Sequence, residues 1–323
     1  MQTTILGRTG LKVSIAGLGS GGFSRLGLAN GATEDEAIAV VRLAHELGVT
    51  LFDTGTHYLN EAVLGRALKP IPRDSITITG KSPIHRGAAA RPTAEVIGML
   101  DDTLRHLQTD HLDVFQLHGP PPGLYQHAVD EIIPALNREK EKGKFRFLGI
   151  SETAPGDVHH TVLARAAQAD LIDVCMVAFH MMHQTARQDL FPITRAKNIG
   201  TMMMYAVRGI FTRPERLAPE IAALVAAGQL PAEFAKKDNA LDFLIHAAGA
   251  SSLPDAAYRY VRHEPGVNIC LFGTGSQTHL RENLTSIGKP PLSDADRAQI
   301  NALFGHLIGV GLDRPPHATP LPA

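Results

Sequence analysis

The segment LFDTGTHY, residues 51–58, decides the fold because an apolar strand here ends in polar side chains. Its apolar run stops at Asp53, and the turn that follows carries Tyr58. Similar apolar runs recur along the chain with amphipathic stretches between them, which predicts βα units and a parallel sheet. The predicted strands are 15–18, 51–53, 76–80, 112–117, 147–151, 174–179, 201–205 and 269–272. This series predicts one α/β domain over residues 1–323, a (β/α)8 TIM barrel, a fold of about 250 residues.

Helix start and stop signals lie between the predicted strands. Thr33 and Glu36 have the spacing of a capping box, and Gly48 is placed to end the same helix. Thr93 predicts the start of a second helix, because apolar residues recur behind it at helical spacing. Both apolar stripes predict helices that pack on the outside of the barrel.

Segments outside the repeated units carry signals of their own. Residues 3–14, TTILGRTGLKVS, predict a β-hairpin that plugs the bottom of the barrel. Residues 212–267 predict a long insertion between strands seven and eight, in which PEIAALVAAG and NALDFLIHAAG have helical patterns. From about residue 313 the tail is rich in proline, and we expect it to be irregular.

Composition narrows the class of protein. The chain has 323 residues and a formal net charge of -1, so neither nucleic acid nor a membrane surface is expected as a partner. Cys175 and Cys270 lie within apolar runs, a pattern that does not indicate a disulfide framework. The first residues lack the pattern of a secretory signal, and no apolar run approaches about 18 residues, so we expect a cytoplasmic protein.

Four ionisable side chains follow neighbouring predicted strands. Asp53 and Tyr58 follow the second strand, Lys81 ends the third and His118 ends the fourth. Because the carboxyl ends of barrel strands meet on the face that carries active sites, we expect these four side chains to converge. Each taken alone has a plainer explanation, such as a helix cap, a solvated lysine or a packed ring. Their joint placement indicates a catalytic site.

The set suits the reduction of a carbonyl group. A hydride that reaches the carbonyl carbon leaves an alkoxide that needs a proton, and Tyr58 is the donor. The ammonium of Lys81 is expected to lower the pKa of Tyr58, and Asp53 keeps Lys81 charged and oriented. His118 can hydrogen-bond the substrate oxygen and stabilise its developing charge. In the reverse direction, the phenolate of Tyr58 is a general base for alcohol oxidation.

These segments resemble the aldo-keto reductase superfamily over nearly the whole chain. The motifs that carry the resemblance are LGRTGLKVSIAGLGSGGF at residues 6–23, DTGTHY at 53–58, the lysine and histidine that end strands three and four, GIS at 149–151 and GTGSQTHLRENL at 273–284. Such a family implies a (β/α)8 barrel and a nicotinamide cofactor bound without a Rossmann domain. It also implies that the four side chains above act as a catalytic tetrad.

Residues 17–22 satisfy the G-x-G-x-x-G pattern of Rossmann domains, but their context differs. The next helix starts near Thr33 rather than at the third glycine. The acidic strand end, Asp53, lies well beyond the expected offset of about 20 residues. By the resemblance, the turn at Gly19 and Ser20 instead borders the nicotinamide end of the cofactor.

The phosphate end of the cofactor is expected where strand eight leads into a helix through Gly273, Thr274, Gly275 and Ser276. Free backbone N–H groups at a helix N-terminus bind anions, and phosphate sites of this barrel commonly lie after strands seven and eight. A plain βα turn is the alternative. The resemblance further implies that Tyr205 stacks on the nicotinamide and that Glu282 and Asn283 reach the adenine. Arg208 is expected at the pyrophosphate, and Ala206 is a further expected cofactor contact.

Several cofactor positions depart from the pattern of the family. Glu152 after Ser151 stands where asparagine usually holds the carboxamide, and Met176 stands where glutamine is usual. His279 and Gly273 occupy the places of the arginine and lysine often used for the 2′-phosphate. NADP(H) is therefore the favoured cofactor, and NAD(H) stays open.

The sequence predicts an oxidoreductase that moves a hydride between nicotinamide and the carbonyl or alcohol of a small polar substrate, such as an aldehyde, ketone or sugar. The alternative is a cofactor-binding regulatory subunit with little turnover, as among potassium-channel β subunits of the same superfamily. A metal-dependent hydrolase is disfavoured, because His180 and His183 lack a third ligand; these histidines are expected to line the substrate pocket. The sequence leaves open the substrate, the reaction direction, and whether the protein is a monomer or a homodimer.

Overall fold

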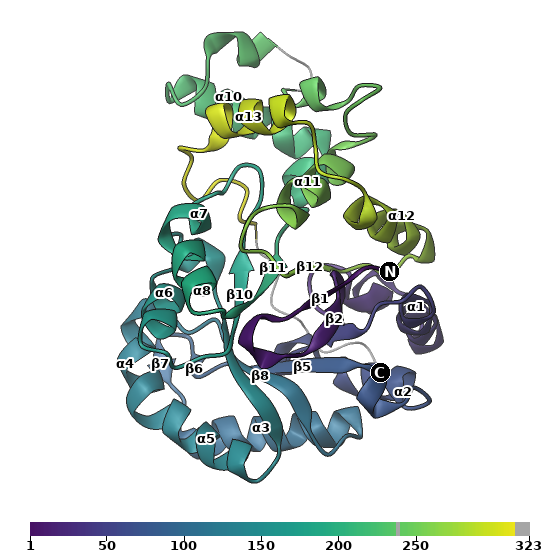
Figure 1. The fold of residues 1–323 in the computed structure, drawn as a ribbon, viewed down its shortest axis with the longest axis vertical. Helices are drawn as coiled ribbons and strands as arrows, with labels where there is room; N and C mark the ends of the chain where they lie inside the picture. Colours follow the sequence, from purple (N-terminus) through teal and green to yellow (C-terminus); the bar gives the residue numbers. More distant parts are fainter. Residues whose placement is uncertain (237–239, 314–323) are drawn as a thin grey trace.

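A closed barrel of parallel strands forms the centre of the computed structural model, which describes residues 1–236 and 240–313 (Figure 1). Neighbours around the barrel follow the order β10-β11-β12-β3-β4-β5-β8-β9. The strands are β3 (Ala16–Gly19), β4 (Leu51–Asp53), β5 (Thr77–Ser82), β8 (Leu112–His118), β9 (Phe145–Ser151), β10 (Val174–Ala178), β11 (Gly200–Met204) and β12 (Ile269–Phe272). The predicted (β/α)8 barrel is confirmed, with every strand boundary within 2 residues of its predicted place.

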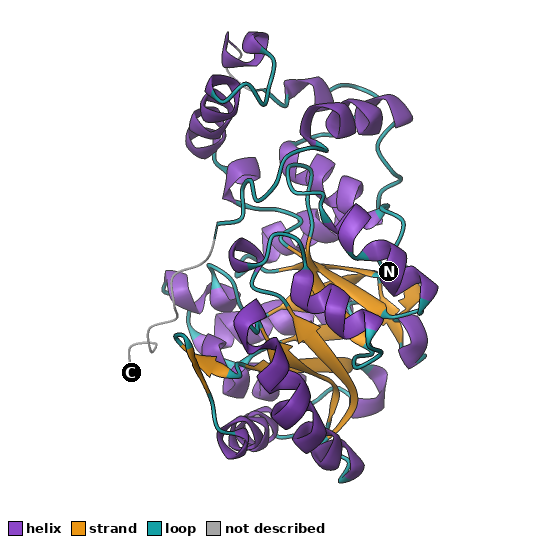
Figure 2. Cartoon of the chain, turned by 90° about the vertical axis from the view of Figure 1, so that its left-hand side faces the viewer, coloured by secondary structure: helices purple, strands orange, loops and turns teal. Residues whose placement is uncertain are grey.

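Helices surround the strands and extend beyond one end of the barrel (Figure 2). They are α1 (Glu34–Glu46), α2 (Glu61–Leu68), α3 (Thr93–Leu107), α4 (Tyr125–His127), α5 (Ile133–Glu141), α6 (Thr161–Gln168), α7 (Ala186–Asp189), α8 (Phe191–Ala196), α9 (Gly209–Thr212), α10 (Pro214–Ala226), α11 (Leu253–Arg262), α12 (Gln277–Gly288) and α13 (Asp294–Phe304). A second small hairpin, β6 (His85–Arg86) with β7 (Ala89–Ala90), follows β5 and was not predicted. No helix in the described part of the chain is long and apolar enough to cross a membrane.

The first barrel helix, α1, begins and ends at the predicted residues. The Thr33 hydroxyl accepts a hydrogen bond from the Glu36 backbone N–H, and the Glu36 carboxylate accepts one from the Thr33 N–H. Gly48 follows the helix with φ +90°, a conformation that glycine adopts without strain. The helix α3 also begins at the predicted residue, Thr93, and Pro92 precedes it without a side-chain cap.

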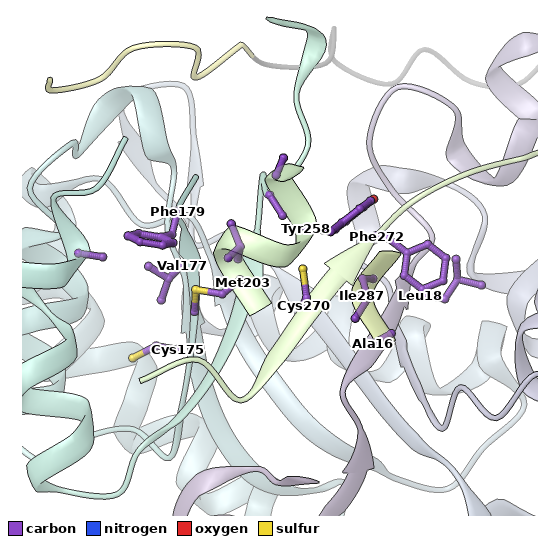
Figure 3. Packing of buried hydrophobic residues seen from close by; sticks show 14 of the residues in the cluster. Ala16, Leu18, Cys175, Val177, Phe179, Met203, Tyr258, Cys270, Phe272 and Ile287 are labelled. Carbon is purple, nitrogen blue, oxygen red and sulfur yellow. The ribbon is translucent and has the colours of Figure 1, made fainter. Parts of the chain in front are cut away.

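Alternate strand residues face the barrel interior and the outer helices. In β10, Val174 and Met176 belong to the interior cluster, whereas Cys175 and Val177 belong to the larger cluster around the barrel (Figure 3). This alternation follows from the two-residue period of a strand. Cys175 and Cys270 are free and buried within strands, as predicted.

The predicted N-terminal hairpin forms and closes the amino-terminal end of the barrel. Its strands β1 (Thr3–Ile5) and β2 (Lys12–Ser14) pair antiparallel. The buried Leu6, Leu11 and Val13 belong to the interior cluster, together with residues near the amino ends of the barrel strands. The hairpin therefore acts as the expected plug.

The predicted insertion lies between β11 and β12, but only one of its two expected helical patterns forms a long helix. PEIAALVAAG contributes to α10, whereas NALDFLIHAAG makes only a 3-10 turn at Asp242–Leu244 within its described residues. Leu241 and Leu244 are both buried, and a single tight turn is enough to bury side chains at this spacing. The proline-rich tail expected after residue 313 lies outside the described residues.

We predict that Leu6→Ala lowers the free energy of unfolding by about 2–5 kcal/mol, because it removes a fully buried side chain and leaves a cavity. Urea denaturation measures the change. Ile5→Ala is the matched control, since Ile5 is 49% exposed and its truncation is expected to cost less than about 0.5 kcal/mol. Equal losses in both variants would contradict the role of the hairpin as a plug.

Candidate active site

A cavity of about 1320 Å³ opens at the carboxyl ends of the barrel strands. Small-molecule sites typically measure about 300–1,000 Å³, so this cavity has room for an extended ligand. The predicted site residues that line it are Gly19, Asp53, Tyr58, Met176, Tyr205, Ala206, Arg208, Gly273, Thr274, Gly275, Ser276, His279, Glu282 and Asn283. The predicted catalytic and phosphate ends thus share one cavity.

A buried ion pair joins the ends of β4 and β5 beside this cavity. The Lys81 ammonium donates to both Asp53 oxygens, at 2.8 and 2.6 Å, and to the Thr54 carbonyl at 2.9 Å. The Thr79 hydroxyl donates to Asp53 at 2.7 Å. Burial by itself lowers the pKa of Lys81, but the Asp53 carboxylate outweighs it and leaves that pKa raised. Lys81 is therefore a fixed positive charge at neutral pH.

Tyr58 lies against this positive charge. The Lys81 ammonium is 4.9 Å from the centre of the Tyr58 ring. Burial raises the pKa of Tyr58, and although Lys81 lowers it as predicted, the pKa stays above its usual value. The expectation of a lowered pKa is therefore wrong in its net result, because desolvation outweighs the ammonium. The phenol of Tyr58 carries its proton at neutral pH.

His118 lies beside Tyr58. The two rings meet edge to face with their centres 5.8 Å apart. Burial, and then the charge of Lys81, hold the pKa of His118 well below its usual value. The His118 imidazole is therefore neutral at physiological pH and able to donate one hydrogen bond. The predicted tetrad of Asp53, Tyr58, Lys81 and His118 is assembled in one place.

The predicted phosphate end is a helix N-terminus, as expected. Ser276 caps α12 by accepting a hydrogen bond from the His279 backbone N–H, and Thr274 accepts one from the Ser276 N–H. Gly275 packs so closely on Gly27 that a Cβ at Gly275 would lie 2.2 Å from the Gly27 Cα. This close packing holds the loop before α12 against the loop after β3.

Three predicted cofactor residues point elsewhere. Ser20 is buried with its hydroxyl 2.9 Å from that of Thr54, and neither Ser20 nor Ser151 lines the cavity. Glu152 also lies off the cavity, because its carboxylate accepts from the Ala178 N–H at 2.6 Å and pairs with the ring Nδ1 of His160 at 2.7 Å. A buried carboxylate needs such partners, so Glu152 is engaged within the protein, and its predicted contact with the cofactor stays a prediction.

His180 and His183, which were expected to line the substrate pocket, are not among the residues that line the cavity. Both side chains are fully buried and lie off the cavity. Burial holds the pKa of His180 well below its usual value and lowers that of His183 to about 3. These neutral rings are part of the packing around β10, and no cluster of three metal-ligating side chains occurs among the described residues.

Gly21 is a site residue that the sequence analysis missed. A Cβ at this position would lie 2.4 Å from the Tyr58 Cζ atom, so only glycine lets the phenol ring occupy its place. The available signal was the cluster of glycines after β3, which resembled a Rossmann fingerprint instead. Thr79, which holds Asp53, was also missed, although its hydroxyl lies in the strand that ends near Lys81.

The closed parallel barrel and the polar cavity at its carboxyl ends place the chain among the (β/α)8-barrel proteins. Within this class, the model of the aldo/keto reductase family matches residues 17–304, and the chain belongs to that family. Aldo-keto reductases are oxidoreductases that use nicotinamide cofactors. The family membership inferred from the motifs is confirmed.

The chain is similar to L-galactose dehydrogenase of Arabidopsis thaliana, at 28% identity over 89% of this chain and 88% of the relative. It is 24% identical to the aldo-keto reductase YhdN of Bacillus subtilis over 95% of each chain. The structure of an aldo-keto reductase from Bacillus halodurans matches with a TM-score of 0.71 at 23% identity, covering 94% of this chain and 96% of that one. A Klebsiella pneumoniae aldo/keto reductase in complex with NADP and acetate matches with a TM-score of 0.66 at 23% identity, covering 99% and 98%.

The contribution of the buried pair of Glu152 and His160 to stability should depend on pH. Burial by itself lowers the pKa of His160, but the Glu152 carboxylate reverses this and leaves the pKa raised. A raised folded-state pKa stabilises the fold fully below the unfolded value of about 6.5, and this stability is lost as pH rises through the folded value.

We therefore expect His160→Gln to cost about 3–5 kcal/mol at pH 6, where it leaves a buried carboxylate without its charged partner. The difference from the wild type should shrink by pH 9, as measured by urea denaturation at both pH values. His111→Gln is the control, because its pair with Asp110 is at the surface and is worth at most about 1 kcal/mol. A cost that grows with pH would rule out a protonated His160.

Proposed function

We propose that the protein is an NAD(P)(H)-dependent oxidoreductase that interconverts the carbonyl and alcohol forms of a small polar substrate. The observation that carries this proposal is the buried pair of Lys81 and Asp53 beside the Tyr58 phenol, at the wall of a large cavity. A phenol, an ammonium and a neutral imidazole at one strand edge are groups suited to proton transfer to an alkoxide.

Tyr58 is the proton carrier in this mechanism. In the direction of reduction, its protonated phenol donates to the oxygen of the carbonyl as negative charge builds there. The Lys81 ammonium stabilises the phenolate that remains, and Asp53 keeps that ammonium in place. In the direction of oxidation, the phenolate accepts the proton of the alcohol.

His118 orients the substrate. Its ring is neutral and edge-on to Tyr58, so a proton on Nε2 can be donated to the same substrate oxygen. Nδ1 is buried and has no hydrogen-bond partner among the described residues, so the substrate oxygen is the partner that would fix the proton on Nε2. Two donors directed at one oxygen hold the carbonyl in place and stabilise its developing charge.

The volume and the lining of the cavity suit a nicotinamide dinucleotide. The N-terminus of α12, beside Thr274 and Ser276, is the end of the helix that attracts phosphate, and Glu282 and Asn283 lie further along the same helix for the adenine. Tyr205 offers an aromatic face to the nicotinamide. When bound, the cofactor supplies or accepts the hydride.

NADP(H) is the favoured form of the cofactor, with NAD(H) as the alternative. A structural neighbour was solved with NADP, which supports the first. Against a strict preference, His279 and Gly273 offer no fixed positive charge at the places where the family often has arginine and lysine. Cofactor titrations with both forms decide between them.

A sugar or a related polar carbonyl compound is the substrate class that we favour, since the relative from Arabidopsis thaliana is named for its action on L-galactose. The competing proposal is a regulatory subunit that binds the cofactor and turns over slowly. A steady-state screen of aldehydes, aldoses and alcohols with both cofactors separates the two. Cofactor binding without turnover on any of them would favour the regulatory role.

Tyr58→Phe is expected to lower the rate of turnover by about 10²–10⁴-fold, because it removes the proton carrier and keeps the ring. Absorbance of the reduced nicotinamide measures the rate, and cofactor affinity, measured separately, should stay close to that of the wild type. Full activity in this variant would sink the proposed mechanism.

Gly21→Ala tests the placement of the phenol without touching it. The added methyl would lie within 2.4 Å of the Tyr58 ring and must displace it, so we expect kcat to fall by about 10²-fold. Gly98→Ala is the matched control, because nothing lies within 4 Å of a Cβ at that position in α3. Unchanged kcat in Gly21→Ala would show that the exact place of the Tyr58 ring does not matter.

A further inference from the structure

A carboxylate of the protein itself occupies a pair of arginines in the wall of the cavity. The Arg208 Nε donates to one oxygen of Asp313 at 2.9 Å, and the Arg208 guanidinium also donates to the Asp313 backbone carbonyl. Arg216, in α10, donates to the other carboxylate oxygen at 3.1 Å. All three residues line the cavity. The two guanidinium groups therefore form an anion site whose present occupant is Asp313.

This anion site is built into the mouth of the cavity. The Arg208 guanidinium lies 3.9 Å from the centre of the Tyr205 ring and 5.3 Å from that of Phe23. Its side chain is only 8% exposed, and that of Asp313 is 23% exposed. Tyr205 itself adopts φ +68°, a strained conformation for a tyrosine. Such strain and burial are typical of a functional site rather than of a solvated surface pair.

The chain reaches this site through a segment that is packed into the core up to Leu312. After α13, Gly309 and Gly311 adopt positive φ values, and Leu312 packs in a small buried cluster. Asp313 is the last residue that the structure describes in this segment. The Asp313 carboxylate is held by Arg208 and Arg216. An anion that binds these two arginines would therefore displace the carboxylate.

Two guanidinium groups directed at one carboxylate form the geometry that also binds phosphate or the carboxylate of a ligand. A site filled by an internal carboxylate binds an external anion more weakly, in proportion to the fraction of molecules in which it is free. Neutralising the internal carboxylate should therefore strengthen binding of the external one.

We infer that Asp313 is an internal competitor at this anion site and that an anionic group of a ligand displaces it from Arg208 and Arg216. The ligand group is either a phosphate of the cofactor or a carboxylate of the substrate, since the two arginines line the same cavity as the proposed cofactor and substrate sites. The inference rests on the proposed function only for the identity of the ligand. Binding of simple anions tests it without any turnover.

The test compares Asp313→Asn with the wild type, using inorganic pyrophosphate in calorimetric titrations and acetate in ligand-observed NMR. We expect Asp313→Asn to bind at least one of these anions about tenfold more tightly, a change of about 1.4 kcal/mol. A gain confined to pyrophosphate identifies the phosphate of the cofactor as the natural ligand group. A gain confined to acetate identifies a substrate carboxylate.

Asp110→Asn is the matched control, because it removes the same charge from a side chain that is 90% exposed and paired with His111. Its anion affinities should equal those of the wild type. Adding Arg216→Gln to Asp313→Asn should remove most of the gain, since the second arginine is then absent. Unchanged or weaker affinity for both anions in Asp313→Asn would overturn the inference, and weaker affinity would show instead that Asp313 fastens the segment over the ligand. If the protein binds anions as expected but reduces no carbonyl, the proposed function fails and this inference stands.

Discussion

The buried pair of Lys81 and Asp53 is the interaction on which the site depends. Two charges removed from water are costly unless their geometry is nearly ideal and their remaining hydrogen bonds are satisfied. The register of β4 on β5 meets this demand, because it places Asp53 opposite Thr79. Lys81 follows Thr79 by two residues, so both side chains point to the same face of the strand and reach Asp53. Tyr58 and His118 then find their places around a positive charge that cannot move. A slip of one residue between these strands would turn the Lys81 side chain to the other face of the sheet, away from Asp53.

The barrel provides the rigid frame that this pair requires. Interior side chains fill the lower barrel, the N-terminal hairpin closes it with Leu6, Leu11 and Val13, and the outer helices cover the other face of each strand. The polar residues that line the cavity lie at and beyond the carboxyl ends of the strands. Arg208 and the N-terminus of α12 line the same cavity, so the barrel brings distant segments of the chain together.

Local patterns were enough to predict most of the framework and the convergence of Asp53, Tyr58, Lys81 and His118. Polar residues that directly follow an apolar run can be recognised in the sequence, as Lys81 and His118 show. The capping box of Thr33 and Glu36 lies within four consecutive residues and can be recognised in the same way. The sequence did not reveal contacts with other segments. Glu152 follows a strand as a cofactor residue would, and only the structure shows that it pairs with His160 from the next segment. The second helical pattern of the insertion makes only one turn, in which Leu241 and Leu244 are buried.

The sequence by itself determined which residues alternate between strand and helix, and therefore the barrel, its polar edge and the four ionisable groups on it. Only the tertiary structure decided the electrostatics of those groups. Desolvation raises the pKa of Tyr58 against the effect of Lys81, and it keeps His118 neutral. Only the tertiary structure brought Asp313 to Arg208 across 105 residues of chain and set Gly21 against Tyr58. Periodicity is local and can be read along a chain, whereas burial and close approach depend on segments that meet only after folding.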